Sequence, residues 1–202
     1  MENTLKMGIT KTFLGILTGI LLFAMPATAG EWKLDPGHSG VMFETRHLFS
    51  TVRGQFNLFS ANVSFDPKVP ENSKIRFEVD VDSINTQNNK RDQHLRSKDF
   101  FNTSRFPKMS FVSKRIRPGK KGRYILEGQL TIKDVTRDVT LDLVFLGKAP
   151  NPFKPTQIVG GFESRFALNR LEFQVGNGRF FDMGVVDKDI DILISVEMFE
   201  TP

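Results

Sequence analysis

The chain of 202 residues contains no cysteine, so it can form no disulfide, and its stability must come from packing. Tryptophan and tyrosine are almost absent as well, with one residue of each, whereas phenylalanine occurs 20 times. A phenylalanine ring offers apolar surface without a hydrogen-bonding group. The interior predicted by this composition is therefore almost purely hydrocarbon, which suits either a solid core or a pocket for an apolar ligand.

Motifs for nucleophilic and metal catalysis are also missing. The chain has no G-x-S-x-G turn and no Ser/His pair at a recognisable spacing. Its three histidines, His38, His47 and His94, fall in two segments without an HxH or HExxH spacing. We therefore expect no catalytic residue, no metal site and no cofactor. The alternative is a quinone-linked or metal-dependent enzyme, or a redox accessory, that uses the three histidines together.

The charge is modestly positive and has no concentrated block. The 28 basic and 23 acidic residues give a net charge of +5 at pH 7. A nucleic-acid partner is not expected, because such proteins carry a basic patch or stripe. Scattered charge usually forms a solvated exterior, but its positive sign leaves open a transient contact with an anionic membrane surface. The sequence does not decide the oligomeric state, and a homodimer is one option.

The first 29 residues have the pattern of a cleaved signal peptide. Lys6 and Lys11 precede an apolar run over residues 13–25, and small residues follow at 27–29. Only 14 residues separate Lys11 from Pro26, whereas a membrane-spanning helix needs about 20. We expect cleavage before Gly30, a periplasmic location, and one domain over residues 30–202. Because no cysteine follows the run, a lipoprotein anchor is not expected.

The rest of the chain alternates apolar and polar residues at period two. In residues 74–83, for example, Ile75, Phe77, Val79 and Val81 share one face, and charged side chains take most of the other. An all-β fold is predicted, an eight-stranded antiparallel β-barrel, which is just wide enough to fill itself or to hold one small ligand. The strands are expected at 39–47, 50–65, 74–84, 108–117, 123–133, 135–147, 156–169 and 185–199.

The inward-facing rows identify the side chains that would line the barrel. Alternation alone shows which residues face inward, but not whether space remains between them. A filled core and a tunnel therefore both fit the pattern. The residues expected to line a tunnel are Val41, Phe43, Phe56, Ile75, Phe77, Val79, Phe111, Leu126, Leu130, Leu141, Leu143, Phe162, Phe166, Ile192 and Ile194.

One long connection, residues 86–101, is rich in helix formers and predicts a short helix over one end of the barrel. Asp92 and Arg96 are four residues apart and are expected to form an ion pair. The helix is either a lid that brings polar groups to a ligand or a structural cap. The expected contacts to a ligand head group or at the mouth are His47, Arg91, His94 and Tyr124.

Several motifs, in order, resemble the YceI-like family of polyisoprenoid-binding proteins. They include His38-Ser39, RDQHLRSKDFF at 91–101 and Asn169-Arg170, and the resemblance covers residues 31–199. It implies an exported, lipocalin-like barrel with a tunnel for a long-chain amphiphile such as a polyprenyl chain, a quinone tail or a fatty amide. This favours the tunnel over the filled core. The expected protein is thus a non-enzymatic lipid-binding protein whose partner is an isoprenoid or another lipid.

The chain departs from the family pattern at a few positions. Asp134 and Asp138 stand where the family often has glycine and proline, which alters one hairpin. The family's glycine shortly after Asn169-Arg170 is not evident, because 171–175 reads LEFQV. This last difference lies in a long connection that we expect near the pocket, so it bears on ligand size and head group.

Overall fold

The structure is a computed structural model, and it describes residues 30–201. The signal peptide predicted at 1–29 lies outside the described residues. No helix in the described part is long and apolar enough to cross a membrane.

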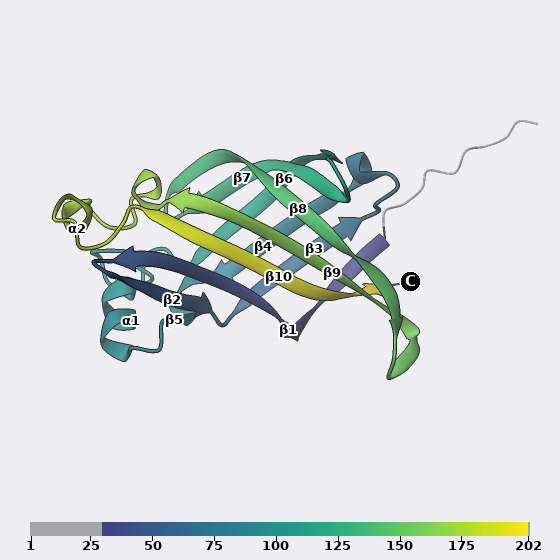
Figure 1. Ribbon diagram of the computed structural model, residues 1–202, viewed down its shortest axis with the longest axis horizontal. Coiled ribbons are helices and arrows are strands. Elements are labelled where there is room, and N and C mark those ends of the chain that lie inside the picture. The colour runs from purple at the N-terminus through teal and green to yellow at the C-terminus, as the bar shows by residue number, and fades with distance from the viewer. Residues whose placement is uncertain (1–29, 202) are drawn as a thin grey trace, which may run out of the picture.

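A single antiparallel sheet closes on itself to form the barrel (Figure 1). Neighbouring strands run in the order β10-β9-β8-β7-β6-β4-β3-β1, and β10 pairs with β1 to complete a ring of eight. The predicted eight-stranded, lipocalin-like antiparallel barrel is confirmed. The strands are β1 (Gly30–His47), β2 (Ser50–Phe56), β3 (Phe59–Phe65), β4 (Lys74–Asp80), β5 (Ile84–Asn85), β6 (Lys108–Pro118), β7 (Arg123–Ile132), β8 (Val135–Asn151), β9 (Lys154–Asn169) and β10 (Asp189–Thr201).

Strand β1 begins earlier than predicted and bends in its middle. Its pairing with β10 shifts register between Asp35 and Gly40, which marks a bulge. The first half of β1 pairs with β3, and the second half pairs with β2. Both halves of β1 pair with β10, while the other edge of the strand changes partner from β3 to the small β1-β2-β5 extension.

The predicted strand 50–65 is interrupted, so its prediction as one strand is wrong. At the break, the Asn57 N–H donates to the Ser83 carbonyl (3.2 Å), and the Asp80 N–H donates to the Leu58 carbonyl (2.9 Å). The predicted strand 74–84 also ends early, at Asp80. There the Asp80 carboxylate accepts from the Asp82 N–H (3.0 Å) and starts a 3₁₀ turn, Val81–Ser83.

Short helical segments lie between the strands. Helix α1 (Asn89–Arg96) is shorter than the predicted 86–101, and it starts where the Asn88 side chain accepts from the Arg91 N–H (3.0 Å). The connection between β9 and β10 holds a 3₁₀ turn (Arg170–Phe173) and one turn of helix, α2 (Arg179–Asp182), which was not predicted. A further 3₁₀ turn covers Pro70–Asn72. Helices α1 and α2 lie at the same end of the barrel (Figure 1).

An aromatic cluster fills the opposite end. Trp32 packs edge-on against Phe162, with ring centroids 5.3 Å apart, and its indole N–H donates to the Phe65 carbonyl (3.0 Å). Phe65 in turn contacts Phe145 and Tyr124, with centroid distances of 5.5 and 5.1 Å. These rings close the end of the barrel away from the helices, which we call the floor.

Candidate functional site

The barrel is hollow between the floor and α1. The cavity has a volume of about 820 Å³, and apolar side chains make up most of its wall. All fifteen side chains predicted to line a tunnel lie along it. The structure thus brings the predicted set together, and their contact with a ligand stays a prediction.

The cavity follows the length of strand β10. Alternate residues of this strand, from Ile190 near the helices to Met198 beside the floor, line the wall. The eight steps from Ile190 to Met198, at about 3.4 Å each, correspond to about 27 Å along the strand. A long, narrow, apolar space of this kind matches an extended hydrocarbon chain better than a compact polar molecule. Ile190, Val196 and Met198 were missed as lining residues, although they continue the alternation of Ile192 and Ile194.

Basic side chains of the cavity wall gather at its helical end, which we call the mouth. Arg91 and His94 from α1 and His47 from the end of β1 lie there, as the sequence predicts. Lys90 of α1 and Thr45 of β1 also line this end and were not predicted. A ligand held in the cavity would therefore have its apolar part inside and its polar group near basic side chains.

Helix α1 is fixed to the barrel by its own polar side chains. Buried Asp92 accepts hydrogen bonds from the backbone N–H (2.9 Å) and the hydroxyl of Thr86. Arg91 reaches back to the same residue, with Nε 2.7 Å from the Thr86 hydroxyl oxygen and Nη2 2.7 Å from its carbonyl oxygen. These bonds set the position of the helix across the mouth. They also occupy much of the Arg91 guanidinium, which was predicted to contact a ligand head group.

The predicted ion pair between Asp92 and Arg96 is wrong. Arg96 donates instead to the backbone carbonyls of Asp82 and Ile84, each at 2.8 Å. Four-residue spacing permits the pair in an isolated helix, but burial of Asp92 against Thr86 leaves its carboxylate facing the barrel. Both side chains serve the attachment of α1 to the preceding segment.

His94 forms part of the wall under α1. Its ring packs edge-on against Phe100 and Phe180, with centroid distances of 5.0 and 6.0 Å. Its Nε2 lies 3.3 Å from the Asp99 carboxylate. The imidazole at the mouth is thus held between an exposed acid and two aromatic rings.

Tyr124, predicted near the mouth, lies at the opposite end. It is the second residue of β7, beside the floor, where it packs against Phe65, and its hydroxyl donates to the Pro67 carbonyl (3.4 Å). Burial there raises the pKa of its phenol above the ordinary value. Tyr124 is not among the residues that line the cavity, so its assignment as a mouth contact is wrong.

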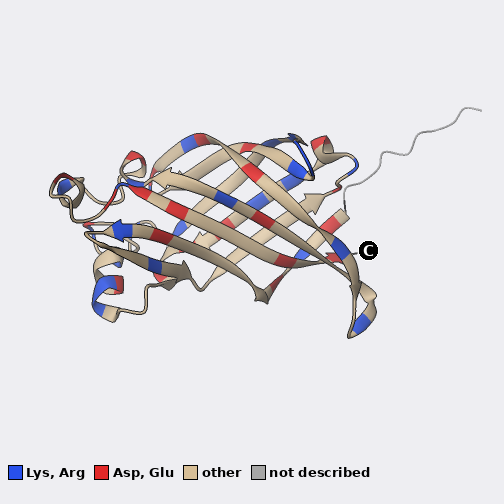
Figure 2. Ribbon diagram, viewed as in Figure 1, with Lys and Arg blue, Asp and Glu red and all other residues tan. Residues whose placement is uncertain are grey.

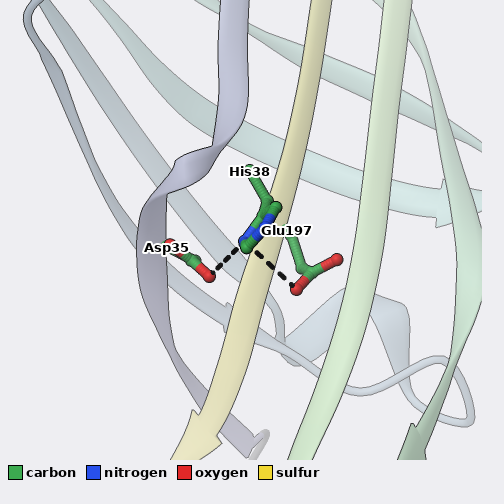
Figure 3. Close-up of side chains that lie close together, drawn as sticks. All are labelled: Asp35, His38 and Glu197. Carbon is green, nitrogen blue, oxygen red and sulfur yellow. Dashed lines mark hydrogen bonds and ion pairs between the residues drawn. The ribbon is translucent and has the colours of Figure 1, made fainter. Parts of the chain in front are cut away.

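The three histidines do not form one group. His47 and His94 line the mouth, whereas His38 projects from the bulge of β1 on the outer wall (Figure 3). There its Nδ1 lies 2.9 Å from an Asp35 carboxylate oxygen and 3.9 Å from Glu197 of β10. The hydrogen bond with Asp35, followed by the charges of Asp35 and Glu197, raises the pKa of His38.

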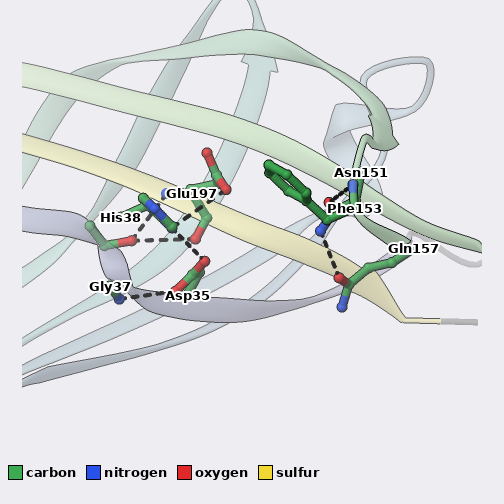
Figure 4. A network of polar contacts seen from close by, with 8 residues as sticks. Asp35, Gly37, His38, Asn151, Phe153, Gln157 and Glu197 are labelled. Atoms are coloured by element: carbon green, nitrogen blue, oxygen red, sulfur yellow. Dashed lines mark hydrogen bonds and ion pairs between the residues drawn. The ribbon is translucent and has the colours of Figure 1, made fainter. Parts of the chain in front are cut away.

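Asp35, His38 and Glu197 are the residues within 30–201 whose donor atoms lie closely enough together to hold a metal ion, within 4.8 Å of one another. Figure 4 shows the polar contacts that surround them. Asp35 accepts from the Gly37 N–H (2.9 Å) as well as from His38, and Ser39 bonds the Glu197 backbone. These contacts connect β1 to β10 across the bulge, and we call the three residues the brace.

Arg170 is a structural residue of the mouth that the sequence analysis did not select. It is only 5% exposed, and it donates to the backbone carbonyls of Asp187 and Val175, both at 2.8 Å. Burial lowers the pKa of its guanidinium, and the nearby Asp187 opposes this shift. Arg170 thereby holds both sides of the β9–β10 connection next to the cavity. The Asn169-Arg170 motif was the available signal.

Comparisons with known proteins agree with this architecture. A UPF0312 protein of Yersinia enterocolitica is 33% identical over 191 residues, covering 93% of this chain and 96% of that protein. The crystal structure of Burkholderia cenocepacia BcnA superimposes with a TM-score of 0.74 at 25% identity, over 81% of this chain and 98% of that one.

A third similar protein is a domain from Saccharophagus degradans described as polyisoprenoid-binding and implicated in plant cell wall breakdown. It matches with a TM-score of 0.60 at 14% identity, over 87% of this chain and 99% of that one, which shows a shared fold. The family model of the YceI-like domain matches residues 32–198. With the closed barrel, its long apolar cavity and the relatives above, this chain belongs to the YceI-like family.

Proposed function

We propose that this protein binds a long-chain amphiphile, such as a polyisoprenoid or a quinone with its tail, for transport or sequestration. The observation that carries the proposal is the apolar cavity of about 820 Å³, which is closed by aromatic rings at one end and bordered by polar groups at the other. The Saccharophagus degradans domain, described as polyisoprenoid-binding, has the same fold and supports this ligand class.

Binding would be driven by burial of the hydrocarbon chain. At about 25 cal/mol per Å², a chain that buries about 400 Å² gains about 10 kcal/mol before the entropic costs of binding. The walls offer few polar partners, so they select for apolar surface and length rather than for a pattern of hydrogen bonds. Selection of the head group would fall to the mouth, where Lys90 and His94 favour a polar or anionic group.

The proposal includes that the protein is not an enzyme. The competing hypothesis, a quinone-linked or metal-dependent enzyme, needs His38, His47 and His94 to act together. His38 lies on the outer wall, away from the two histidines at the mouth, and this separation favours the binding protein. The competing hypothesis predicts stoichiometric metal in the purified protein and turnover that depends on these histidines.

We further propose that the protein is exported to the periplasm after removal of residues 1–29. Support comes from the charged start, the short apolar run and the small residues before Gly30. N-terminal sequencing of the protein recovered from a periplasmic extract should begin at Gly30. A protein that starts at Met1 and stays in the cytoplasm would contradict export.

Mass spectrometry of an organic extract tests the proposed ligand class. The full chain is produced in cells, and the exported protein is purified without detergent. We expect one class of long-chain lipid at about one molecule per protein. An empty extract together with bound metal would favour the competing enzyme hypothesis.

A pair of neighbouring substitutions assigns the lipid to the cavity. Phe77 lies in the cavity wall, whereas the next residue, Glu78, faces outward between Arg76 and Lys108. Phe77→Asp should abolish lipid recovery, because it places a carboxylate against the hydrocarbon chain. Glu78→Gln should leave recovery unchanged. Circular dichroism checks that both variants fold, and equal lipid recovery from two folded variants would place the lipid elsewhere.

A further inference from the structure

Exposed apolar side chains gather around the mouth. Eight large hydrophobic residues are exposed within residues 30–201, and four of them belong to the β1–β2 turn and to α2 with its C-terminal residue. They are Leu48 and Phe49 in the turn and Phe181 and Met183 beside it, and we call these four residues the apolar rim. The Phe49 side chain is 96% exposed. Such a grouping marks an interaction surface.

The backbone holds the two halves of the apolar rim together. The Leu48 N–H donates to the Val185 carbonyl (2.9 Å), and the Asp187 N–H donates to the Arg46 carbonyl (3.1 Å). His47 forms a β-bridge with Val186 between these two bonds. The turn and the α2 segment are therefore one surface at the helical end of the barrel (Figure 1).

Basic side chains without an ionic partner surround this surface. Arg46, Lys90 and Arg179 are exposed, and none of the three forms an ion pair within the described residues. Asp182 of α2 is an exposed acid that opposes them. Figure 2 shows Lys and Arg in blue and Asp and Glu in red on the ribbon at the helical end.

Two acids near the rim already have basic partners. Glu44 pairs with Arg53 (2.9 Å), and Asp189 pairs with Lys188 (2.7 Å). Next to the rim, the three unpaired cations therefore outnumber the one exposed unpaired acid. Exposed apolar side chains next to unpaired cations are the combination that binds the interface of an anionic bilayer.

The rim is continuous with the cavity. His47, Val185 and Val186 join the two halves of the rim, and all three also line the cavity. A hydrocarbon chain that leaves the cavity through the mouth would therefore pass directly into the medium that contacts the rim. Entry into water would expose the whole chain, whereas entry into a bilayer would keep it in an apolar medium.

We propose that the protein docks mouth-first on an anionic lipid bilayer through the apolar rim and its unpaired basic residues. The inference rests on the proposed function, because the membrane would be the donor or acceptor of the bound lipid. Leu48 and Phe49 enter the interface between head groups and acyl chains, and Arg46, Lys90 and Arg179 contact the anionic head groups.

Vesicle flotation tests the docking. The purified protein is mixed at low salt with vesicles of phosphatidylcholine alone or with phosphatidylcholine containing about one third phosphatidylglycerol. The double variant Leu48→Ser/Phe49→Ser is compared with Phe153→Ser. Phe153 is also 96% exposed but lies in the β8–β9 turn at the other end of the barrel, so it is a matched control.

We expect the protein to float with the anionic vesicles and the double variant to bind them at least about tenfold more weakly. Phe153→Ser should bind like the unchanged protein, and Arg46→Gln/Lys90→Gln should weaken binding to the anionic vesicles alone. No flotation, or equal loss in the double variant and in Phe153→Ser, would overturn the proposal. A dimer in solution that the double variant dissociates would assign the rim to a second copy and would also overturn it.

Lipid extraction from the same preparations separates this inference from the proposed function. A protein that carries lipid but does not float with vesicles contradicts membrane docking and leaves lipid binding intact. A protein that floats but yields no lipid supports docking and contradicts the proposed cargo.

Discussion

At the scale of single residues, the brace between β1 and β10 makes a pH-dependent contribution to stability. The pKa of Asp35 is lowered chiefly by its hydrogen bond with His38, and the pKa of His38 is raised by the same bond. A raised histidine pKa stabilises the fold below the ordinary value of 6.5, and this contribution is lost as the pH rises through the raised value. A lowered carboxyl pKa stabilises above 3.8 and is lost as the pH falls. The pair therefore acts fully between these values.

We predict that the raised pKa of His38 depends mainly on Asp35. In Asp35→Asn, the pKa of His38 should fall toward its ordinary value, because the hydrogen-bonded carboxylate at 2.9 Å has lost its charge. Glu197→Gln should produce a smaller fall, since this carboxylate lies 3.9 Å away. NMR titration of the His38 ring measures both shifts. A larger fall in Glu197→Gln would contradict the arrangement of the brace. The effect on stability should be small, because the His38 side chain is 71% exposed.

Alternation predicted which residues face the cavity, but it did not predict how far along the barrel axis each residue lies. Tyr124 belongs to the same inward row of β7 as Leu126 and Leu130, and it does face inward. Its depth depends on which end of β7 meets the floor, and period-two alternation carries no information about that. Arg170 was missed for a related reason. Its partners are backbone carbonyls of Asp187 and Val175, which only the folded β9–β10 connection brings within reach.

At the scale of elements, α1 depends on the buried contact between Asp92 and Thr86. Asp92→Ala would leave the Thr86 N–H and hydroxyl without their acceptor, and each unsatisfied buried group costs about 1–3 kcal/mol. We expect Asp92→Ala to lose about 2–4 kcal/mol in the free energy of unfolding, measured by urea denaturation. Asp92→Asn keeps one acceptor oxygen and should lose less.

Gln93→Ala is the control for this measurement. Gln93 is the next residue of α1 and is exposed, so its replacement should change the free energy of unfolding by less than about 0.5 kcal/mol. Equal losses in Asp92→Ala and Gln93→Ala would mean that the helix is not fixed through Thr86.

The elements themselves were predictable where a local pattern decides them. Strands β6 to β9 follow clean alternation, and their observed bounds lie close to the predicted ones. The break at Asn57-Leu58 had a local signal that the prediction missed, because the inward row runs over even positions up to Phe56 and over odd positions from Phe59. It forms because both residues bond the segment 80–83, a contact between distant parts of the chain. Helix α2 is a single turn, too short to produce a helical period in the sequence.

At the scale of the whole molecule, different parts of the barrel interior stabilise the fold and enclose the cavity. The floor, with Trp32 and Phe65, is packed ring against ring and stabilises the fold. The middle, with side chains such as Ile194 and Val196, surrounds open space. Because a solid core and a tunnel share the same alternation, the sequence pattern alone could not separate them, and the resemblance to the YceI-like family was needed to favour the tunnel.

This division predicts losses of stability of different size for the same substitution at two buried valines. Val196 lines the cavity near the floor, whereas Val81 is buried outside it. Adding a ring to a packed core costs about 1–3 kcal/mol, so Val81→Phe should lower the free energy of unfolding by that amount. Val196→Phe should cost less, since its ring can extend into the open space.

The same variant, Val196→Phe, should change the length of the bound lipid. The introduced ring would fill the deep end of the cavity, while the polar groups at the mouth, including Lys90 and His94, would still fix the head group. The hydrocarbon chain would then have less room, and mass spectrometry of the extracted lipid should show shorter chains than those from the unchanged protein. If Val196→Phe destabilises the fold as much as Val81→Phe and leaves chain length unchanged, the ligand does not reach the floor. Chain length would then be set by another part of the barrel.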